Sequence, residues 1–288
     1  MRQRVVITGA SSGIGRATAE RFAEKDADLA LIARSERRLQ ELASDLKAAG
    51  AEAHPIVADL AEEGKPRWAI EHAADKLGGI DVLVANAAAS AFGPFEEIPP
   101  KDFRRTVEVS LFGAIETTRA GLPYLQKSKG TLIVTGSIVR DISMPMFTPY
   151  ITAKAGLRGF VDALRSELHQ AGSPVEVCIV EPGPVDTPFW KMVDSTTGEV
   201  PPVPVGAVDA SQVADKIVER SASPTARSVV GPYALAQRSL ARALPRLTDR
   251  LLPLAERYFE KGSEPARGPG ALWQPAERAA ARKSRDIE

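Results

Sequence analysis

A glycine-rich segment near the start of the chain, Thr8–Gly15, constrains the fold more than any other feature of the sequence. The preceding run, Arg4–Ile7, is short and largely apolar, as in a buried strand, and Arg16–Ala23 carries its apolar residues on one face of a helix. The glycines therefore occupy a strand-to-helix turn. The free N–H groups of the first helical turn face any ligand held there, and they favour an anion such as a pyrophosphate.

The three glycines of this turn have different uses. Gly9 and Gly13 permit a tight turn and let a ligand approach the backbone, whereas Gly15 permits the helix to pack closely on the sheet. Their spacing, Gly-x-x-x-Gly-x-Gly, is one residue longer between the first two glycines than the commonest dinucleotide fingerprint, and glycines alone fit an ordinary turn equally well. A bound nucleotide would be contacted by Gly9, Ser11, Ser12, Gly13, Ile14 and Gly15.

Composition excludes several classes of protein. The 288 residues contain 37 Lys and Arg against 37 Asp and Glu, and this balance argues against a nucleic-acid partner. Cys178, the one cysteine, lies in an apolar run and is expected to be a buried, inert thiol. No metal site is expected, because His54, His72 and His169 lack ligand spacing. No apolar run approaches the ~20 residues of a membrane span, so we expect a cytoplasmic protein.

Strands and helices are expected to alternate along the chain. The expected strands are residues 4–7, 27–33, 52–58, 80–85, 130–137, 175–181 and a short one near 228–231. The expected helices are 16–23, 35–49 with Ser35 as its cap, 62–77, 99–127, one that carries residues 150 and 154, and 209–221. This order predicts an α/β fold, a single Rossmann-type, doubly wound parallel sheet of about seven strands flanked by helices, with ligands at the carboxyl ends of the strands.

The chain is longer than this fold needs. We expect residues 1–232 to form the Rossmann domain, with a Pro-, Thr- and Val-rich substrate lid at about 188–208. Residues 233–288 are expected to form a C-terminal helical extension that ends in a flexible tail rich in proline, glycine and charge. Its amphipathic helices could pack on the active-site mouth, bury a dimer surface or lie on a membrane.

A serine, a tyrosine and a lysine occur at a spacing that suits acid–base chemistry. Tyr150 and Lys154 lie on one face of a helix, where the lysine charge favours phenolate and lowers the tyrosine pKa from ~10. Ser137 ends a strand shortly before them. A Tyr-x-x-x-Lys pair alone is also a common surface pair. Together with Thr8–Gly15 and Asn86, however, these residues resemble the core of the short-chain dehydrogenase/reductase family over residues 1–230.

The resemblance implies an oxidoreductase that interconverts a carbonyl and a secondary alcohol by hydride transfer from a nicotinamide cofactor. In the family pattern Tyr150 is the acid/base, Ser137 hydrogen-bonds the reacting oxygen, and Lys154 lowers the Tyr150 pKa and holds the nicotinamide ribose. Ser110 stands where the family has an asparagine that bends a helix and holds a water in a proton relay. A hydroxyl lacks the paired donor and acceptor set of an amide, so this is the largest departure.

The cofactor favoured by the sequence is NADP(H). The second expected strand ends at Arg34, where an NAD-specific enzyme would carry an acidic residue for the ribose 2′-hydroxyl. Arg34 can pair with a 2′-phosphate instead, although a solvated residue at a helix start is the alternative. Asp59 matches the family position that contacts the adenine edge, and it can also cap a helix. Further cofactor contacts are expected from Leu60, Asn86, Ala87, Tyr150, Lys154, Pro182, Gly183, Val185 and Thr187.

Two other functions stay open on the sequence. A regulatory or scaffold protein of the same fold would bind the cofactor without significant turnover, and a lipid reductase would use the C-terminal helices to dock on a membrane. The identity of the small carbonyl or alcohol substrate is not defined. Several apolar residues fit either a pocket wall or the ordinary core, namely Phe92, Phe95, Met144, Met146, Phe147 and Trp190. The resemblance also implies a homodimer or homotetramer.

Overall fold

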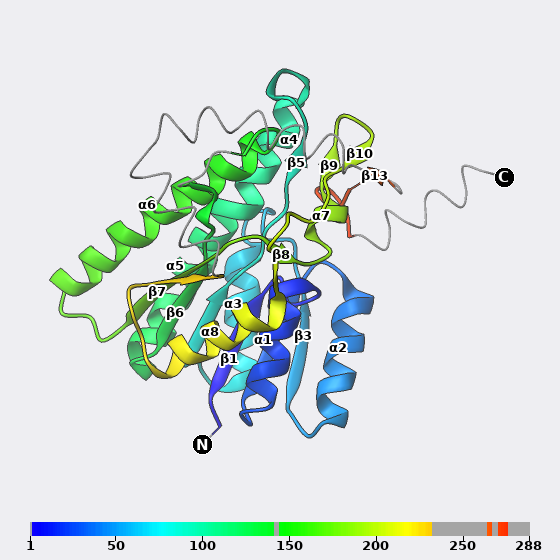
Figure 1. Cartoon of the computed structure of the whole chain (residues 1–288). Helices are drawn as coiled ribbons and strands as arrows, with labels where there is room; N and C mark the ends of the chain where they lie inside the picture. Colours follow the sequence, from blue (N-terminus) through cyan, green and yellow to red (C-terminus); the bar gives the residue numbers. More distant parts are fainter. Residues whose placement is uncertain (1, 141–143, 232–263, 267–269, 276–288) are drawn as a thin grey trace.

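A seven-stranded parallel sheet forms the centre of the protein (Figure 1). The computed structural model describes residues 2–140, 144–231, 264–266 and 270–275. The strand order is β12-β7-β6-β4-β1-β2-β3, so the chain winds outward from β1 in one direction and then in the other. The strands are β1 (Arg4–Thr8), β2 (Asp28–Ala33), β3 (Ala53–Val57), β4 (Val82–Ala85), β6 (Thr131–Thr135), β7 (Glu176–Pro182) and β12 (Arg227–Val230). The predicted doubly wound α/β fold is confirmed.

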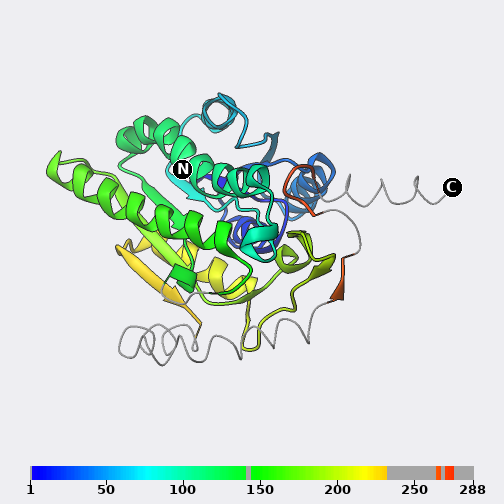
Figure 2. The same cartoon turned by 90° about the horizontal axis from the view of Figure 1, so that it is seen from above.

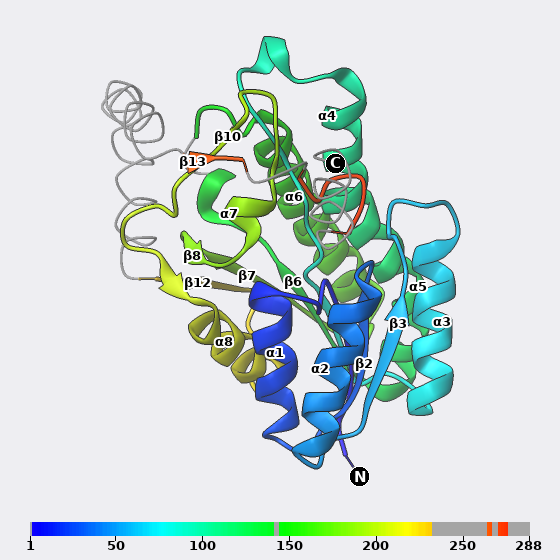
Figure 3. The same cartoon turned by 90° about the vertical axis from the view of Figure 1, so that its right-hand side faces the viewer.

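Alternate residues of the central strands face two separate cores. In β1, Val5 and Ile7 belong to one core and Val6 to the other, and all three are fully buried. One face is covered by α1 (Gly13–Ala23), α2 (Glu36–Ala48) and α8 (Ala210–Ala222), and the other by α3 (Lys65–Leu77), α5 (Gly113–Ser128) and α6 (Thr148–Gln170), as Figure 3 shows. Burial on both faces explains why the strands are continuous apolar runs in the sequence.

Three helices differ from their predicted bounds by three residues or more, and the first of them, α1, begins at Gly13 rather than at residue 16. The helix expected from residue 62 begins at Lys65, because Gly64 adopts a φ of +75° just before it and Pro66 lies in its first turn. The long helix expected at 99–127 is divided into α4 (Pro100–Val107), a π-helical turn η2 (Glu108–Phe112) and α5. Among the described residues, no helix combines the length and apolar character that crossing a membrane requires.

Short elements lie around the carboxyl edge of the sheet. The predicted lid contains α7 (Phe189–Met192), β9 (Asp194–Ser195) and β10 (Glu199–Val200), and β11 (Val208–Asp209) follows it. β9 pairs with β5 (Ala91–Phe92), which follows β4, and β11 pairs with β8 (Val185–Asp186), which follows β7. The lid is therefore held at two points by segments that follow sheet strands. The 3-10 turns η1 (Phe95–Glu97) and η3 (Ile138–Arg140) complete this edge.

Two C-terminal segments pack against this same edge (Figure 2). β13 (Glu264–Pro265) pairs antiparallel with β10 of the lid, and residues 270–275 lie beside the end of β2, where Arg34 contacts them. The sequence did not indicate these packed segments, since proline, glycine and charge predict a flexible tail. The amphipathic helices expected within residues 233–259 fall outside the described residues.

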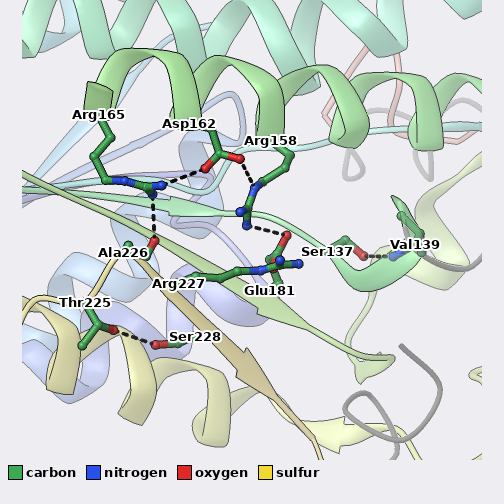
Figure 4. Close-up of polar contacts among 10 residues, drawn as sticks. All are labelled: Ser137, Val139, Arg158, Asp162, Arg165, Glu181, Thr225, Ala226, Arg227 and Ser228. Atoms are coloured by element: carbon green, nitrogen blue, oxygen red, sulfur yellow. Dashed lines mark hydrogen bonds and ion pairs between the residues drawn. The ribbon is translucent and has the colours of Figure 1, made fainter. Parts of the chain in front are cut away.

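A buried ion network anchors α6 to the sheet (Figure 4). The Glu181 side chain of β7 is 1 % exposed, and its carboxylate pairs with Arg158 of α6 at 3.4 Å and with Arg227 of β12. Arg158 also pairs with Asp162 one turn further along α6 at 2.6 Å. A buried carboxylate needs such partners, and here they join three elements near the carboxyl end of β7. The helix that carries Tyr150 and Lys154 is thereby fixed relative to the strands.

Candidate active site

The glycine loop after β1 is shaped by close backbone approaches. Gly9 and Gly13 have φ values of +69° and +52°, in the left-handed region that favours glycine. A Cβ at Gly9 would lie 2.8 Å from the Ala87 Cα atom, and one at Gly15 would lie 2.8 Å from the Asn86 Nδ2 atom. Gly15 therefore permits close packing of α1 on the loop itself and on the residues after β4.

The start of α1 leaves its backbone donors available. Its N-cap residue Ser12 makes no side-chain capping hydrogen bond, and the first turn carries no acidic residue. These N–H groups and the helix dipole suit an anionic group above the loop. The Thr187 side chain, from the segment after β7, packs against the glycine loop, 3.1 Å from the position that a Cβ of Gly13 would take. Ser11 and Ile14 belong to this turn, and Pro182, Gly183 and Val185 belong to the segment that brings Thr187 over it.

Asn86 and Thr8 join the ends of β4 and β1. The Thr8 hydroxyl oxygen accepts from the backbone N–H groups of Asn86 at 2.9 Å and Ala87 at 3.1 Å. The Asn86 amide donates to the Thr8 carbonyl oxygen at 3.1 Å. Asn86 and Ala87 therefore form the floor beneath the glycine loop, in the supporting position expected from the sequence.

The structure brings Ser137, Tyr150 and Lys154 together beside the end of β6. Ser137 hydrogen-bonds the Tyr150 phenol, and its Oγ atom also accepts from the Val139 N–H at 3.3 Å (Figure 4). The Lys154 Nζ atom donates to the Thr135 carbonyl oxygen at 2.8 Å and lies 5.6 Å from the centre of the Tyr150 ring. A proton donor, a second hydroxyl and a cation are thus placed at one point on the carboxyl edge of the sheet.

Burial sets the protonation of these groups. Desolvation raises the pKa of the Tyr150 phenol well above its ordinary value, and the hydrogen bond with Ser137 opposes it only in part. Desolvation also lowers the pKa of Lys154 from 10.5 to about 8. The predicted lowering of the Tyr150 pKa is not found in this structure, because desolvation outweighs the hydrogen bond with Ser137. Tyr150 is therefore a protonated donor at neutral pH.

Ser110 lies at the centre of the π-helical turn and is fully buried. Its Oγ atom donates to the Ala89 carbonyl oxygen at 2.8 Å and accepts from the Ala89 N–H at 3.0 Å. One hydroxyl thus both donates to and accepts from the Ala89 backbone, although it lacks the separate donor and acceptor groups of an amide. The irregular turn is present with serine in place of asparagine, and it is tied to the loop after β4.

Arg34 and Asp59 meet at the other end of the site. Their charged groups approach to 3.7 Å, and Asp59 also pairs with Arg105 of α4. The Asp59 Oδ1 atom accepts from the Ala61 N–H at 3.1 Å. Asp59 therefore caps a turn and not a helix, because the N-cap residue of α3 is Gly64. Leu60 is buried under Gly113, whose added Cβ would lie 3.2 Å from the Leu60 side chain.

The alternative of a solvated Arg34 is wrong. Burial lowers the pKa of its guanidinium, which donates to the carbonyl oxygens of Leu272 at 2.8 Å and of Ala271. The next residue, Ser35, is 6 % exposed, and its hydroxyl makes neither the expected capping bond nor any other hydrogen bond within the described residues. A partly buried arginine followed by a residue with an unpartnered hydroxyl is a donor set that suits a phosphate.

An aromatic cluster lies beside Tyr150. The Phe189 ring of α7 is 5.2 Å from the Tyr150 ring and Phe147 is 6.3 Å from it, measured between ring centres. Phe92, Phe147 and Trp190 are buried in this cluster, and Met144 and Met146 pack on it. Phe95 lies elsewhere and is 63 % exposed, so it is not part of this wall. The surroundings of the phenol are apolar.

Other candidate residues have no catalytic surroundings. Cys178 is buried in the sheet core, and burial raises the pKa of its thiol, in keeping with an inert cysteine. Within the described ranges, no group of three or more His, Cys, Asp or Glu side chains could hold a metal ion. The glycine loop, the Ser–Tyr–Lys cluster and the sheet order are those of a Rossmann-type oxidoreductase.

Comparison with known proteins gives the family. The model for short chain dehydrogenases matches residues 3–198, and the chain therefore belongs to the short-chain dehydrogenase/reductase family of NAD(P)-dependent oxidoreductases. It is 33% identical over 267 residues to the uncharacterized oxidoreductase YxnA of Bacillus subtilis, covering 92% of this chain and 75% of that protein. It is 34% identical to hydroxysteroid 11-beta-dehydrogenase 1-like protein A of Xenopus laevis. That match covers 64% of this chain and 64% of the relative, so it spans less than two thirds of the relative's length.

Solved structures share the fold. An alcohol dehydrogenase from the archaeon Thermococcus sibiricus, complexed with 5-hydroxy-NADP, is 28% identical with a TM-score of 0.70, covering 80% of this chain and 95% of that one. A short chain dehydrogenase from Burkholderia cenocepacia in complex with NADP is 26% identical with a TM-score of 0.71, covering 81% and 97%. A Burkholderia phymatum enzyme in complex with NAD, 24% identical with a TM-score of 0.77, supports the fold alone.

Proposed function

We propose that this protein is an NADP(H)-dependent oxidoreductase that interconverts a small apolar carbonyl compound and the corresponding secondary alcohol. The observation that carries the proposal is the cluster of Ser137, Tyr150 and Lys154 next to an aromatic wall. A partly buried phenol that stays protonated can donate to a carbonyl oxygen, and apolar surroundings strengthen the hydrogen bonds that hold this oxygen.

The cofactor residues fit NADP(H). The glycine loop and the uncapped start of α1 suit a pyrophosphate, and Arg34 with Ser35 suits a 2′-phosphate. The complexes of the Thermococcus sibiricus and Burkholderia cenocepacia enzymes contain NADP-type ligands, which supports the same preference here. Thr187, above the loop, would lie next to the cofactor. When bound, the nicotinamide supplies or accepts the hydride.

The protein's own residues handle the proton and the oxygen. In reduction, Tyr150 donates its phenolic proton to the carbonyl oxygen as this oxygen gains negative charge. In oxidation, the phenolate form of Tyr150 removes the alcohol proton. Ser137 donates a hydrogen bond to the same oxygen. The Lys154 ammonium stabilises the phenolate that proton donation leaves behind. Ser110 and Asn86 hold the loops that form the floor of the site.

The test compares two tyrosines. Tyr150→Phe removes the proton donor, so reduction of ketones and aldehydes by NADPH should slow by about 10³-fold, within the usual range for acid–base catalysis. NADPH affinity should stay unchanged, because the phenyl ring remains. Tyr124→Phe, on α5, is the matched control and should keep full activity. Equal turnover by the two variants would reject the assignment, and cofactor binding without turnover of any carbonyl by wild type would favour the scaffold alternative.

The assembly and location follow the family expectation. We propose a homodimer or homotetramer acting in the cytoplasm on a small carbonyl or alcohol, and light scattering of the purified protein tests the assembly. A monomeric mass would reject the oligomer without affecting the proposed reaction.

A further inference from the structure

The C-terminal segment Gly270–Trp273 occupies the end of the site that holds Arg34. Two of its carbonyl oxygens, those of Ala271 and Leu272, accept hydrogen bonds from the Arg34 guanidinium. The Leu272 carbonyl also accepts from the Arg105 Nε atom at 3.3 Å. The two arginines nearest Asp59 are therefore both bonded to this segment. A 2′-phosphate bound to Arg34 would need the same guanidinium N–H groups that now donate to these two carbonyl oxygens.

An apolar anchor holds the segment in place. The Leu272 side chain is fully buried in a cluster with Ala89, Ala91, Ile98 and Val109, and Ala61 packs on the same cluster. Ala61 follows β3 and Ala89 follows β4, close in sequence to Leu60 and Ala87, where the sequence predicts adenosine contacts. The leucine thus fills space at the adenosine end of the site. Loss of this contact would expose a large apolar side chain to water.

Trp273 adds a second attachment. Its Nε1 atom donates to the Asp102 carboxylate at 2.6 Å, and the Arg105 guanidinium lies 5.2 Å from the ring centre. The ring is 48 % exposed, so the contact is at the surface and one substitution can weaken it without opening the core. Trp68 of α3 gives a close match elsewhere, because it is 45 % exposed and has Lys65 5.1 Å from its ring centre.

The same stretch of chain is joined to the lid. The Ala271 N–H donates to the Met192 carbonyl oxygen of α7 at 2.7 Å, and the Ala266 N–H donates to the Gly198 carbonyl at 2.8 Å. Next to the second contact, β13 pairs with β10 of the lid. A small cavity lies between Arg34, Ser90, Phe189 and Ala271. The segment therefore bridges the lid over Tyr150 and the arginine at the adenosine end.

We propose that Gly270–Trp273 is an internal strap that competes with the adenosine 2′-phosphate of NADP(H) for Arg34 and must be displaced before the cofactor is fully bound. The proposal rests on the proposed function, because it requires NADP(H) to bind at Arg34. Peptide carbonyls are neutral acceptors, whereas a phosphate is an anion that forms stronger, charge-assisted hydrogen bonds with a guanidinium. NADPH can therefore replace the strap, while NADH would leave the partly buried Arg34 without an acceptor in place of the strap carbonyls.

Either cofactor has to displace the strap, because Leu272 fills space at the adenosine end, so releasing the strap should tighten the binding of both. In the full-length chain, Leu272→Ala combined with Trp273→Ala should lower the dissociation constants of both cofactors by about tenfold, equivalent to about 1.4 kcal/mol. Trp273→Ala alone should lower them less, and the matched control Trp68→Ala should change neither. Titration of nicotinamide fluorescence measures each constant. Unchanged or weaker NADPH binding by the double variant would overturn the proposal.

A second measurement reports on the strap directly and does not depend on the variants folding equally well. Wild-type protein labelled with fluorotryptophan gives resonances for Trp68, Trp190 and Trp273, which single Trp→Phe variants assign. NADPH should move the Trp273 resonance to the position of a solvated tryptophan and leave that of Trp68 in place. A Trp273 resonance that stays unchanged while NADPH binds would reject the strap but not the reductase. Failure of wild type and double variant to bind NADPH would reject the proposed function itself.

Discussion

The two ends of the site are built in different ways. At the catalytic end, Ser137, Tyr150 and Lys154 come from β6 and the adjoining α6, and their polar partners lie close to them in the chain. At the adenosine end, Arg34 and Arg105 obtain their acceptors from Ala271 and Leu272, far along the sequence. The catalytic end is complete within the Rossmann fold, whereas the adenosine end is completed by a segment from outside it.

The catalytic end determines the chemistry, whereas the adenosine end determines how readily the cofactor binds. A fixed helix, anchored through the buried Glu181 network, holds the acid/base group in one geometry. The acceptors on Arg34 are carried by a short segment that one leucine anchors, and a charged ligand can replace them. Variants of the catalytic end should therefore change turnover or core stability, and variants of the adenosine end should change cofactor affinity.

The largest expected effect is at the loop that joins the two ends. Gly15→Ala would place a Cβ 2.8 Å from the Asn86 amide and against the Gly9 backbone, so the fold should lose about 3 kcal/mol or more, together with cofactor binding. Gly159→Ala, in α6, meets no atom within 4 Å and should stabilise the protein by up to about 1 kcal/mol. Denaturant unfolding and NADPH titration of both variants measure this. Similar stabilities would contradict the close packing of α1 on the loop.

The buried ammonium of Lys154 predicts a pH dependence at the catalytic end. Its pKa is about 8 in the folded protein and 10.5 ordinarily, so the unfolded chain binds more protons between these values and stability should rise with pH across them. Relative to Lys154→Met, wild type should gain up to about 3 kcal/mol of unfolding free energy from pH 8 to pH 10.5. The exposed Lys76→Met is the control. A constant difference between wild type and Lys154→Met over this range would contradict the burial of a charged amine.

A smaller effect is expected at Ser110. Ser110→Ala leaves the buried N–H and carbonyl of Ala89 without their partner and should lower the unfolding free energy by about 2 kcal/mol. Thr118→Val is the control, because the buried Thr118 hydroxyl has no hydrogen-bond partner within the described residues and its removal should be nearly neutral. Thermal unfolding of the two variants gives the comparison. If the two lose the same stability, the Ser110 bonds do not hold the loop.

Most of the fold and the catalytic end could be predicted from the sequence, because their signals are local. Apolar runs define strands buried on both faces, and glycine spacing, Ser137 and the Tyr150–Lys154 pair mark the edge of the sheet. The direction of the Tyr150 pKa shift could not be predicted, since it depends on how far the folded chain removes the phenol from water. The tail contact with Arg34 could not be predicted either. It joins residues far apart in sequence, and one buried leucine in a polar tail gives no periodic pattern.

The most direct test of the account is a parallel titration of wild type and Arg34→Ala with NADPH and NADH. We predict that wild type binds NADPH at least about tenfold more tightly than NADH, and that Arg34→Ala removes this difference by weakening NADPH relative to NADH. Arg37→Ala, at an exposed arginine that pairs with Glu41 on α2, should keep the preference. Equal affinities in wild type, or an NADPH preference that survives in Arg34→Ala, would contradict the assignment of the 2′-phosphate site.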